Sequence, residues 1–184
     1  IVSTQRNEAF YQVKDSVFAV NLSSKKSRLV YEFPDDFKAS ITTINANGTL
    51  LAGAKSSDKE KDILKQNPAK SRYFNLIYEA KLPRTLFTID INSGKLSKIF
   101  TDSAWLNHIQ FSPTDPSLLM FCHEGPWHKV DRIRTIDVNS KEIKLVHKRT
   151  MPMEIAGHEW FSKDGRYIWF DLQQPRGATF FVAG

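Results

Sequence analysis

The sequence predicts an all-β fold, a section of a β-propeller with about three to four blade-like, four-stranded antiparallel units and a short helical insertion. Two recurring hairpin patterns and one break in their rhythm lead to this prediction. In the first pattern, apolar and polar residues alternate on both sides of a polar turn, which is Asn-Ser-Gly or Asn-Ser-Lys in two of the three copies, as in half-buried strands. This pattern occurs at residues 17–30, 86–99 and 133–146.

The second pattern is another hairpin, twice with Asn-Gly or Asp-Gly at its turn, where a positive φ is needed. It occurs at residues 41–52, 108–120 and 158–169. Two hairpins make one four-stranded sheet, and sheets recurring about every 40–50 residues are typical of propeller blades. We therefore expect units near residues 1–38, 39–102, 103–150 and 151–184, with the first and last incomplete.

The ring closes only with about four to eight blades, so we expect the chain to be a section of a larger propeller. A closed four-bladed ring is the alternative. The rhythm breaks at residues 56–83, where charged residues come first and apolar residues then recur at helical spacing. We expect two short helices joined by Pro68, inserted between the inner hairpin and the outer strands of the second unit. The insertion is either a solvated excursion or a rim beside a pocket.

Composition limits the function classes. The chain has 184 residues, 41% of them hydrophobic, and a formal net charge of +6. That charge suits an anionic partner but is also common in proteins without one. Nucleic-acid binding is disfavoured because no aromatic residues alternate with the charges of the basic stretch 55–84. No apolar run approaches the roughly 20 residues of a membrane span.

The single cysteine, Cys122, excludes an internal disulfide framework and does not identify the compartment. We expect the cytoplasm, with the periplasm as the alternative.

The richest chemistry lies in residues 122–134, Cys-His-Glu-Gly-Pro-Trp-His-Lys-Val-Asp-Arg-Ile-Arg, between two strand-like runs. Arginines occur in this loop and in the matching loops 81–84 and 171–176. A planar guanidinium can pair with both oxygens of a carboxylate, so arginines in three matching loops favour an acidic ligand. For any single arginine, a solvated surface position is the simpler interpretation.

The histidines give a less definite prediction. His108 and His158 begin corresponding inner strands, where side chains line the central channel, and their role is either structural or ligand-binding. His123 and His128 have no zinc-motif spacing, and no second cysteine accompanies them. We therefore expect no complete metal site in this chain. Neither a Gly-x-Ser-x-Gly elbow nor a phosphate loop is present, which disfavours hydrolases and nucleotide-binding proteins.

Several motifs together resemble one family, the oligogalacturonate lyases of polysaccharide lyase family 22, which are seven-bladed propellers. The specific part is Cys-His-Glu-Gly-Pro at residues 122–126, followed by Val-Asp-Arg at 130–132. Trp-Leu-Asn-His at 105–108 looks like the family's Trp-Leu-Gly-His, and Gly-His-Glu-Trp at 157–160 like its Thr-His-Glu-Phe. The Val-Asp-Arg segment is one residue shorter here than in the form compared.

The resemblance implies β-elimination on oligogalacturonates, short acidic pectin fragments, with Mn²⁺ holding the uronate carboxylate. It also implies an arginine base, here Arg132 with Arg134 in reserve. A guanidinium is normally always charged, so this role needs neighbouring positive charges that lower its pKa. The manganese ligands are expected after Gly184. The residues that we expect to bind substrate are His123, Trp127, His128, His158, His108 and Arg84.

A non-catalytic propeller that binds a partner through its channel is the alternative function. It explains the repeats equally well and leaves the polar loop without a purpose.

Overall fold

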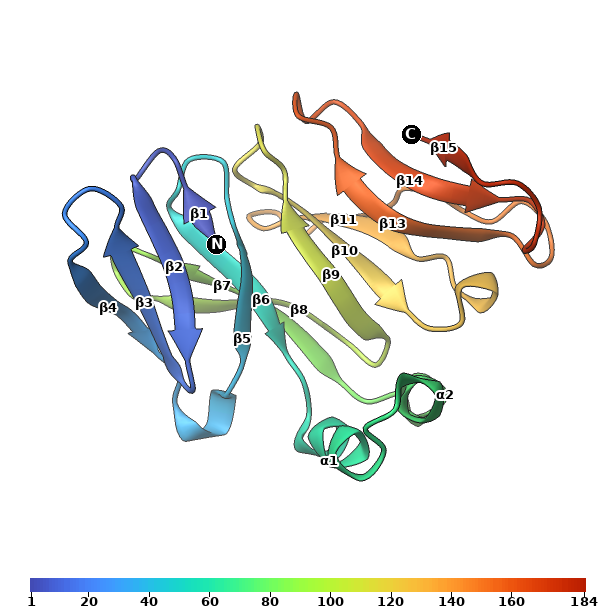
Figure 1. The fold of residues 1–184 in the computed structure, drawn as a ribbon, viewed down its shortest axis with the longest axis horizontal. Helices are drawn as coiled ribbons and strands as arrows, with labels where there is room; N and C mark the ends of the chain where they lie inside the picture. Colours follow the sequence, from blue (N-terminus) through green and yellow to red (C-terminus); the bar gives the residue numbers. More distant parts are fainter.

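The computed structural model describes residues 1–184, which form four antiparallel sheets in chain order (Figure 1). The first sheet contains β1 (Val2–Ser3), β2 (Glu8–Val13), β3 (Ser16–Asn21) and β4 (Ser27–Glu32). The second contains β5 (Ser40–Ile44), β6 (Leu50–Lys55), β7 (Arg84–Asp90) and β8 (Leu96–Asp102). The third contains β9 (Trp105–Phe111), β10 (Leu118–Glu124), β11 (Ile133–Asp137) and β12 (Ile143–Leu145). The fourth contains β13 (Ile155–Phe161), β14 (Ile168–Gln173) and β15 (Phe181–Ala183).

This architecture confirms the predicted propeller-type fold. The first unit, expected to be incomplete, nevertheless has four strands, because Val2 and Ser3 pair with Ala9 and Glu8 as a short inner strand. The fourth sheet has three strands.

The turns of the three outer hairpins share the same pattern of side-chain hydrogen bonds. A side-chain oxygen of Asn21, Asp90 or Asp137 accepts bonds from the backbone N–H groups two and three residues later, at 2.7–3.1 Å. The residue after these turns is left-handed in each case, and only the middle one is a glycine, Gly94, with φ 67°. The Asx turn therefore sets the geometry of all three hairpins.

The apolar core is divided among the spaces between neighbouring sheets. Phe10, Val17 and Phe87 belong to the cluster between the first and second sheets. Leu86, Phe121 and nearby residues fill the next space, and Met120, Ile133, Ala156, Phe161 and Phe170 the last. Strand β10 is thus covered on both faces, because alternate residues point to opposite sides of a strand.

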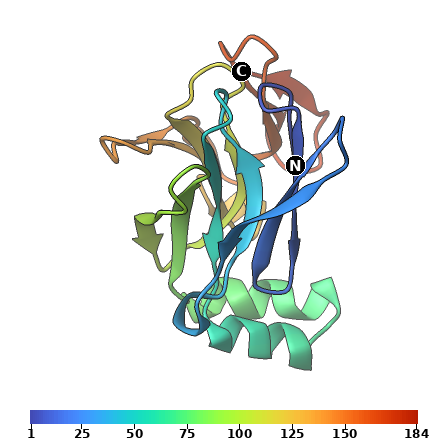
Figure 2. The ribbon, with the colours of Figure 1, turned by 90° about the vertical axis from the view of Figure 1, so that its left-hand side faces the viewer.

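The insertion forms the two predicted helices, α1 (Asp58–Gln66) and α2 (Lys70–Ala80), between β6 and β7. Figures 1 and 2 show both helices at one end of the sheets. The Ser57 hydroxyl caps α1 by accepting a bond from the Glu60 N–H. Glu60, which is 1% exposed, forms an ion pair with Arg84 at the start of β7 and thereby fastens the insertion to the second sheet. Neither helix is long and apolar enough to cross a membrane.

Candidate active site

The candidate site lies at the end of the sheets that carries the helices. A pocket of about 730 Å³ opens between α2, the loop after β10 and the loop after β14. Its wall includes Phe74, Trp127, His128, Lys129 and Arg176. The volume lies within the usual range of small-ligand pockets, roughly 300–1,000 Å³.

Two inner strands carry a β-bulge at the same repeat position, and each bulge contains a histidine. The register of β9 against β10 shifts beside His108, and that of β13 against β14 shifts beside His158. Both histidines have left-handed backbones, with φ 48° and 52°. Bulges redirect side chains and collect near functional sites, and a left-handed backbone is strained for residues other than glycine. The predicted equivalence of these histidines is thus visible in the backbone.

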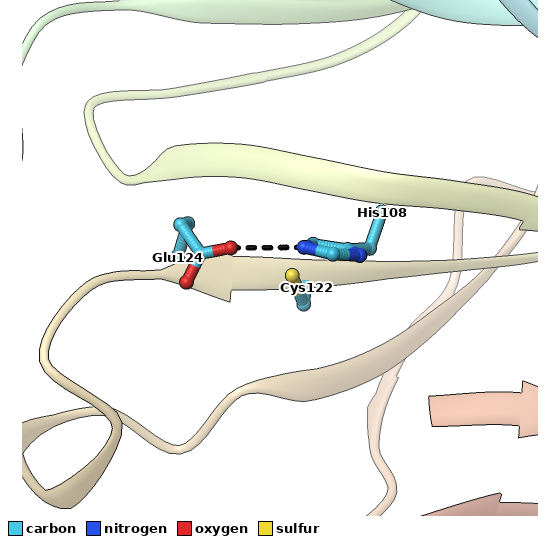
Figure 3. Close-up of side chains that lie close together, drawn as sticks. All are labelled: His108, Cys122 and Glu124. Carbon is cyan, nitrogen blue, oxygen red and sulfur yellow. Dashed lines mark hydrogen bonds and ion pairs between the residues drawn. The ribbon is translucent and has the colours of Figure 1, made fainter. Parts of the chain in front are cut away.

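A largely buried charge cluster lies at the end of β10, next to the loop that contributes Pro126 and Trp127 to the pocket. The Nε2 of His108 lies 3.0 Å from the Oε2 of Glu124, and the thiol of Cys122 lies beside them (Figure 3). The other oxygen of Glu124 forms an ion pair with Arg132, whose guanidinium is also 3.4 Å from Glu159 and from the Cys122 sulfur. Three of these side chains, Glu124, Arg132 and Glu159, are at most 6% exposed.

The cluster fixes the charge of its members. Burial alone would raise the pKa of Glu124, but the hydrogen bond from His108 and the charge of Arg132 lower it to about 2. The bond to Glu124 in turn raises the pKa of His108. Burial raises the pKa of the Cys122 thiol well above its usual value, so this cysteine is neutral and unreactive.

Arg132 is held in its charged form. Burial alone would lower its pKa, but the negative groups around it, Cys122 when ionised and Glu124 and Glu159, raise it. The groups of this chain around Arg132 therefore favour its charged form, whereas a base must be neutral. The side chain is also 1% exposed, so it does not reach the solvent of the pocket.

Trp127 links this buried arginine to the pocket. Its ring lies 4.9 Å from the Arg132 guanidinium carbon and meets the His158 ring edge-on, with 5.1 Å between centroids. The indole packs directly on Gly157, where an added Cβ would come within 2.7 Å of the ring. Only glycine allows this approach.

His158 has the arrangement of a general base. Its Nδ1 lies 2.8 Å from Asp171 on the neighbouring strand β14, and 65% of its side chain is exposed. A carboxylate at Nδ1 fixes the imidazole orientation and leaves Nε2 available for a proton. The sequence singled out His158 but not Asp171, which only the strand pairing brings beside it.

Two other predicted residues, His123 on β10 and Arg134 on β11, lie outside the pocket. His123 points away from Glu124 toward the second sheet, where its Nε2 lies 3.9 Å from Asp102. Burial and the charge of Arg134 lower its pKa to about 4, so it is neutral. Arg134 itself lies on β11 with its Nε buried and without a hydrogen-bond partner. Neither side chain lines the pocket.

His128 and Arg84 have different surroundings. His128, on the short 3₁₀ turn η2 (Trp127–Lys129), lines the pocket, and burial together with the charges of Arg176 and Lys129 lowers its pKa. Arg84 instead pairs with Glu60 and donates a hydrogen bond to the Leu106 carbonyl. Its guanidinium therefore has a structural task, and it does not line the pocket.

One group of side chains could in principle hold a metal. Donor atoms of His108, Cys122 and Glu124 lie within 4.8 Å of one another. The donors do not fit a divalent cation, because Glu124 is neutralised by Arg132, His108 shares its nitrogen with Glu124, and Cys122 keeps its proton. The guanidinium beside them would also repel the ion.

Comparison with known proteins places the chain in one family. A family profile described as oligogalacturonate lyase matches residues 2–179. The oligogalacturonate lyase of Dickeya dadantii (strain 3937) is 28% identical over 177 residues, which cover 94% of this chain and 44% of that protein.

Two solved structures share the fold. The oligogalacturonate lyase of Vibrio parahaemolyticus superposes with a TM-score of 0.87 at 25% identity, over 99% of this chain and 48% of that one. An oligogalacturonate lyase in complex with manganese gives 0.84 at 24% identity, over 96% and 46%. The chain thus spans a little under half the length of these relatives. By its sequence from residue 2 to residue 179, the chain belongs to the oligogalacturonate lyase family.

Proposed function

We propose that the protein cleaves oligogalacturonates by β-elimination and that this chain supplies the proton-accepting side of the site. Family membership supports the substrate class. The observation that carries the chemistry is the exposed His158, whose imidazole is fixed by Asp171. His158 is not itself a lining residue of the pocket, but its ring packs against Trp127, which is.

In β-elimination, a base removes the proton on the carbon that bears the uronate carboxylate. The electron pair of that C–H bond forms a double bond to the neighbouring carbon. The bond from that neighbour to the glycosidic oxygen breaks, and the oxygen leaves with its electron pair and then takes a proton. The base must therefore be accessible to the sugar, and it must be uncharged before it takes the proton.

His158 meets these requirements better than Arg132. Its imidazole is exposed, whereas the Arg132 guanidinium is buried between two carboxylates that keep it charged. We therefore assign the base to His158 and its orientation to Asp171. Arg132 then supports the Trp127 ring from below, and Arg134 has no role in the proton transfer.

The side chains of the pocket wall would position the sugar. Trp127 offers an aromatic surface, and His128 lies next to it on η2. We include Mn²⁺ in the proposal for the whole protein, because one solved relative contains manganese and the family resemblance implies it. Since the donor group of this chain does not fit the ion, every step above is assigned to side chains.

The activity test uses the whole protein with Mn²⁺ and digalacturonate. The expected result is a growing absorbance from the conjugated double bond of an unsaturated uronate. Binding of digalacturonate without any new absorbance would refute the lyase proposal and favour a non-catalytic propeller.

A further inference from the structure

Three cationic side chains share the pocket. Lys70 comes from the first turn of α2, Lys129 from η2, and Arg176 from the loop between β14 and β15. They belong to three segments far apart in the sequence, so the fold rather than a local charge run brings them together. None of the 12 lining residues is an aspartate or a glutamate.

These three cations differ from the arginines around them. Arg84, Arg132 and Arg149 each form an ion pair with a carboxylate of this chain. Lys70, Lys129 and Arg176 form none, and Lys70 instead lies 5.6 Å from the Phe74 ring centroid. Of the arginines in the three matching loops, Arg84 and Arg132 are paired and Arg134 does not line the pocket, so only Arg176 is both unpaired and in the pocket.

The backbone that carries Arg176 is firmly held. Its own N–H donates to the Met153 carbonyl at 2.6 Å. The buried Gln173 side chain donates to the Ala178 carbonyl and accepts a hydrogen bond from the Gly177 N–H, which closes the loop around Arg176. A cation on a loop fixed in this way loses little backbone freedom when a ligand binds.

The loop that carries Lys129 is held as well. Arg149 donates one hydrogen bond to the carbonyl of His128 and another to Asp131 at 2.9 Å. The Lys129 N–H donates to the Pro126 carbonyl at 2.7 Å. The backbones of the two loops that carry Arg176 and Lys129 are thus held in place by hydrogen bonds within this chain.

The pocket also has an apolar wall, formed partly by Phe74 of α2 and Trp127 of η2. Aromatic faces suit the C–H surface of a sugar ring, and unpaired cations suit its carboxylate. A neutral sugar would leave the positive charges without a partner.

We propose that this pocket is a subsite for a second uronate unit, next to the one that loses its proton, and that Arg176 and Lys129 bind its carboxylate. The inference rests on the proposed function and adds the residues that select an acidic neighbour. It gives the helical insertion a role, because α2 closes the pocket on the side of Lys70 and Phe74.

The test is equilibrium binding of trigalacturonate to the whole protein by calorimetry, which needs no turnover. The Arg176→Gln and Lys129→Gln variants are expected to bind about 10-fold more weakly, the lower end for a charged hydrogen bond in a partly exposed site. Added salt should weaken the wild type more than either variant. Lys26→Gln, at an exposed lysine of the first sheet's outer hairpin, is the matched control and should bind within about 2-fold of the wild type.

A second ligand separates charge recognition from shape. The methyl ester of trigalacturonate lacks the negative charges, so the variants and the wild type should bind it equally. Equal weakening for the acid and the ester, or unchanged binding of the acid, would overturn the subsite. If the wild type binds the acid in this charge-dependent way but forms no unsaturated product, the lyase proposal fails, while Arg176 and Lys129 remain the binding site of a uronate carboxylate.

Discussion

Replacing Arg132 with methionine tests whether the buried charge cluster depends on this guanidinium. The substitution keeps much of the side-chain volume but leaves Glu124 and Glu159 facing each other, with 6% and 0% of their side chains exposed. Removing one partner of a buried ion pair costs about 3–5 kcal/mol, because the remaining charge is desolvated and unpaired. Against a typical total stability of about 5–15 kcal/mol, this is a large loss.

Urea unfolding at neutral pH, followed by tryptophan fluorescence, measures the loss. Arg28→Met is the control, since Arg28 is 42% exposed and its partner Glu8 keeps a second ion pair with Arg6. That variant should lose less than about 1 kcal/mol. The double variant Arg132→Met/Glu159→Gln should recover part of the loss, because one unpaired charge is gone. A loss below about 1 kcal/mol for Arg132→Met would refute the charge assignment of the cluster.

Two further predictions concern the same region. The pKa of Glu124 is lowered from its usual 4.5 to about 2, so its contribution to stability is complete above about pH 4.5 and lost as the pH falls toward 2. The free energy of unfolding of the wild type should therefore exceed that of Glu124→Gln at about pH 5, and the gap should close as the pH falls from about 4.5 toward 2; a gap that does not change over this acid range would contradict it. Gly157→Ala places a Cβ within 2.7 Å of the Trp127 ring and should reduce turnover of digalacturonate at least about 10-fold by displacing the indole. Unchanged turnover in that variant would show that the Trp127 position is unimportant.

Much of the fold could be predicted because it depends on short local sequence patterns. Asx turns, Asn-Gly and Asp-Gly turns and the period of two specify each hairpin, and the helical spacing of 56–83 specifies α1 and α2. The first sheet was the exception, because its inner strand is only two residues long and too short to carry a pattern.

The site was harder to predict because its partners meet only through strand pairing and sheet packing. The sequence identified His158 and Trp127 but not Asp171, which lies across a bulged ladder. It placed His123 among the substrate-binding residues, although the alternation of the strand turns this side chain toward Asp102 of the second sheet. The environment of Arg132 depends on Glu159 from another sheet, which no local motif reveals.

The most direct test of the central claim compares digalacturonate turnover and binding in His158→Gln and in the wild type, using the whole protein with Mn²⁺. If His158 is the base, its loss should lower kcat about 100-fold or more, the usual contribution of general base catalysis, while digalacturonate still binds. Turnover within a few-fold of the wild type would contradict the assignment of the base to His158.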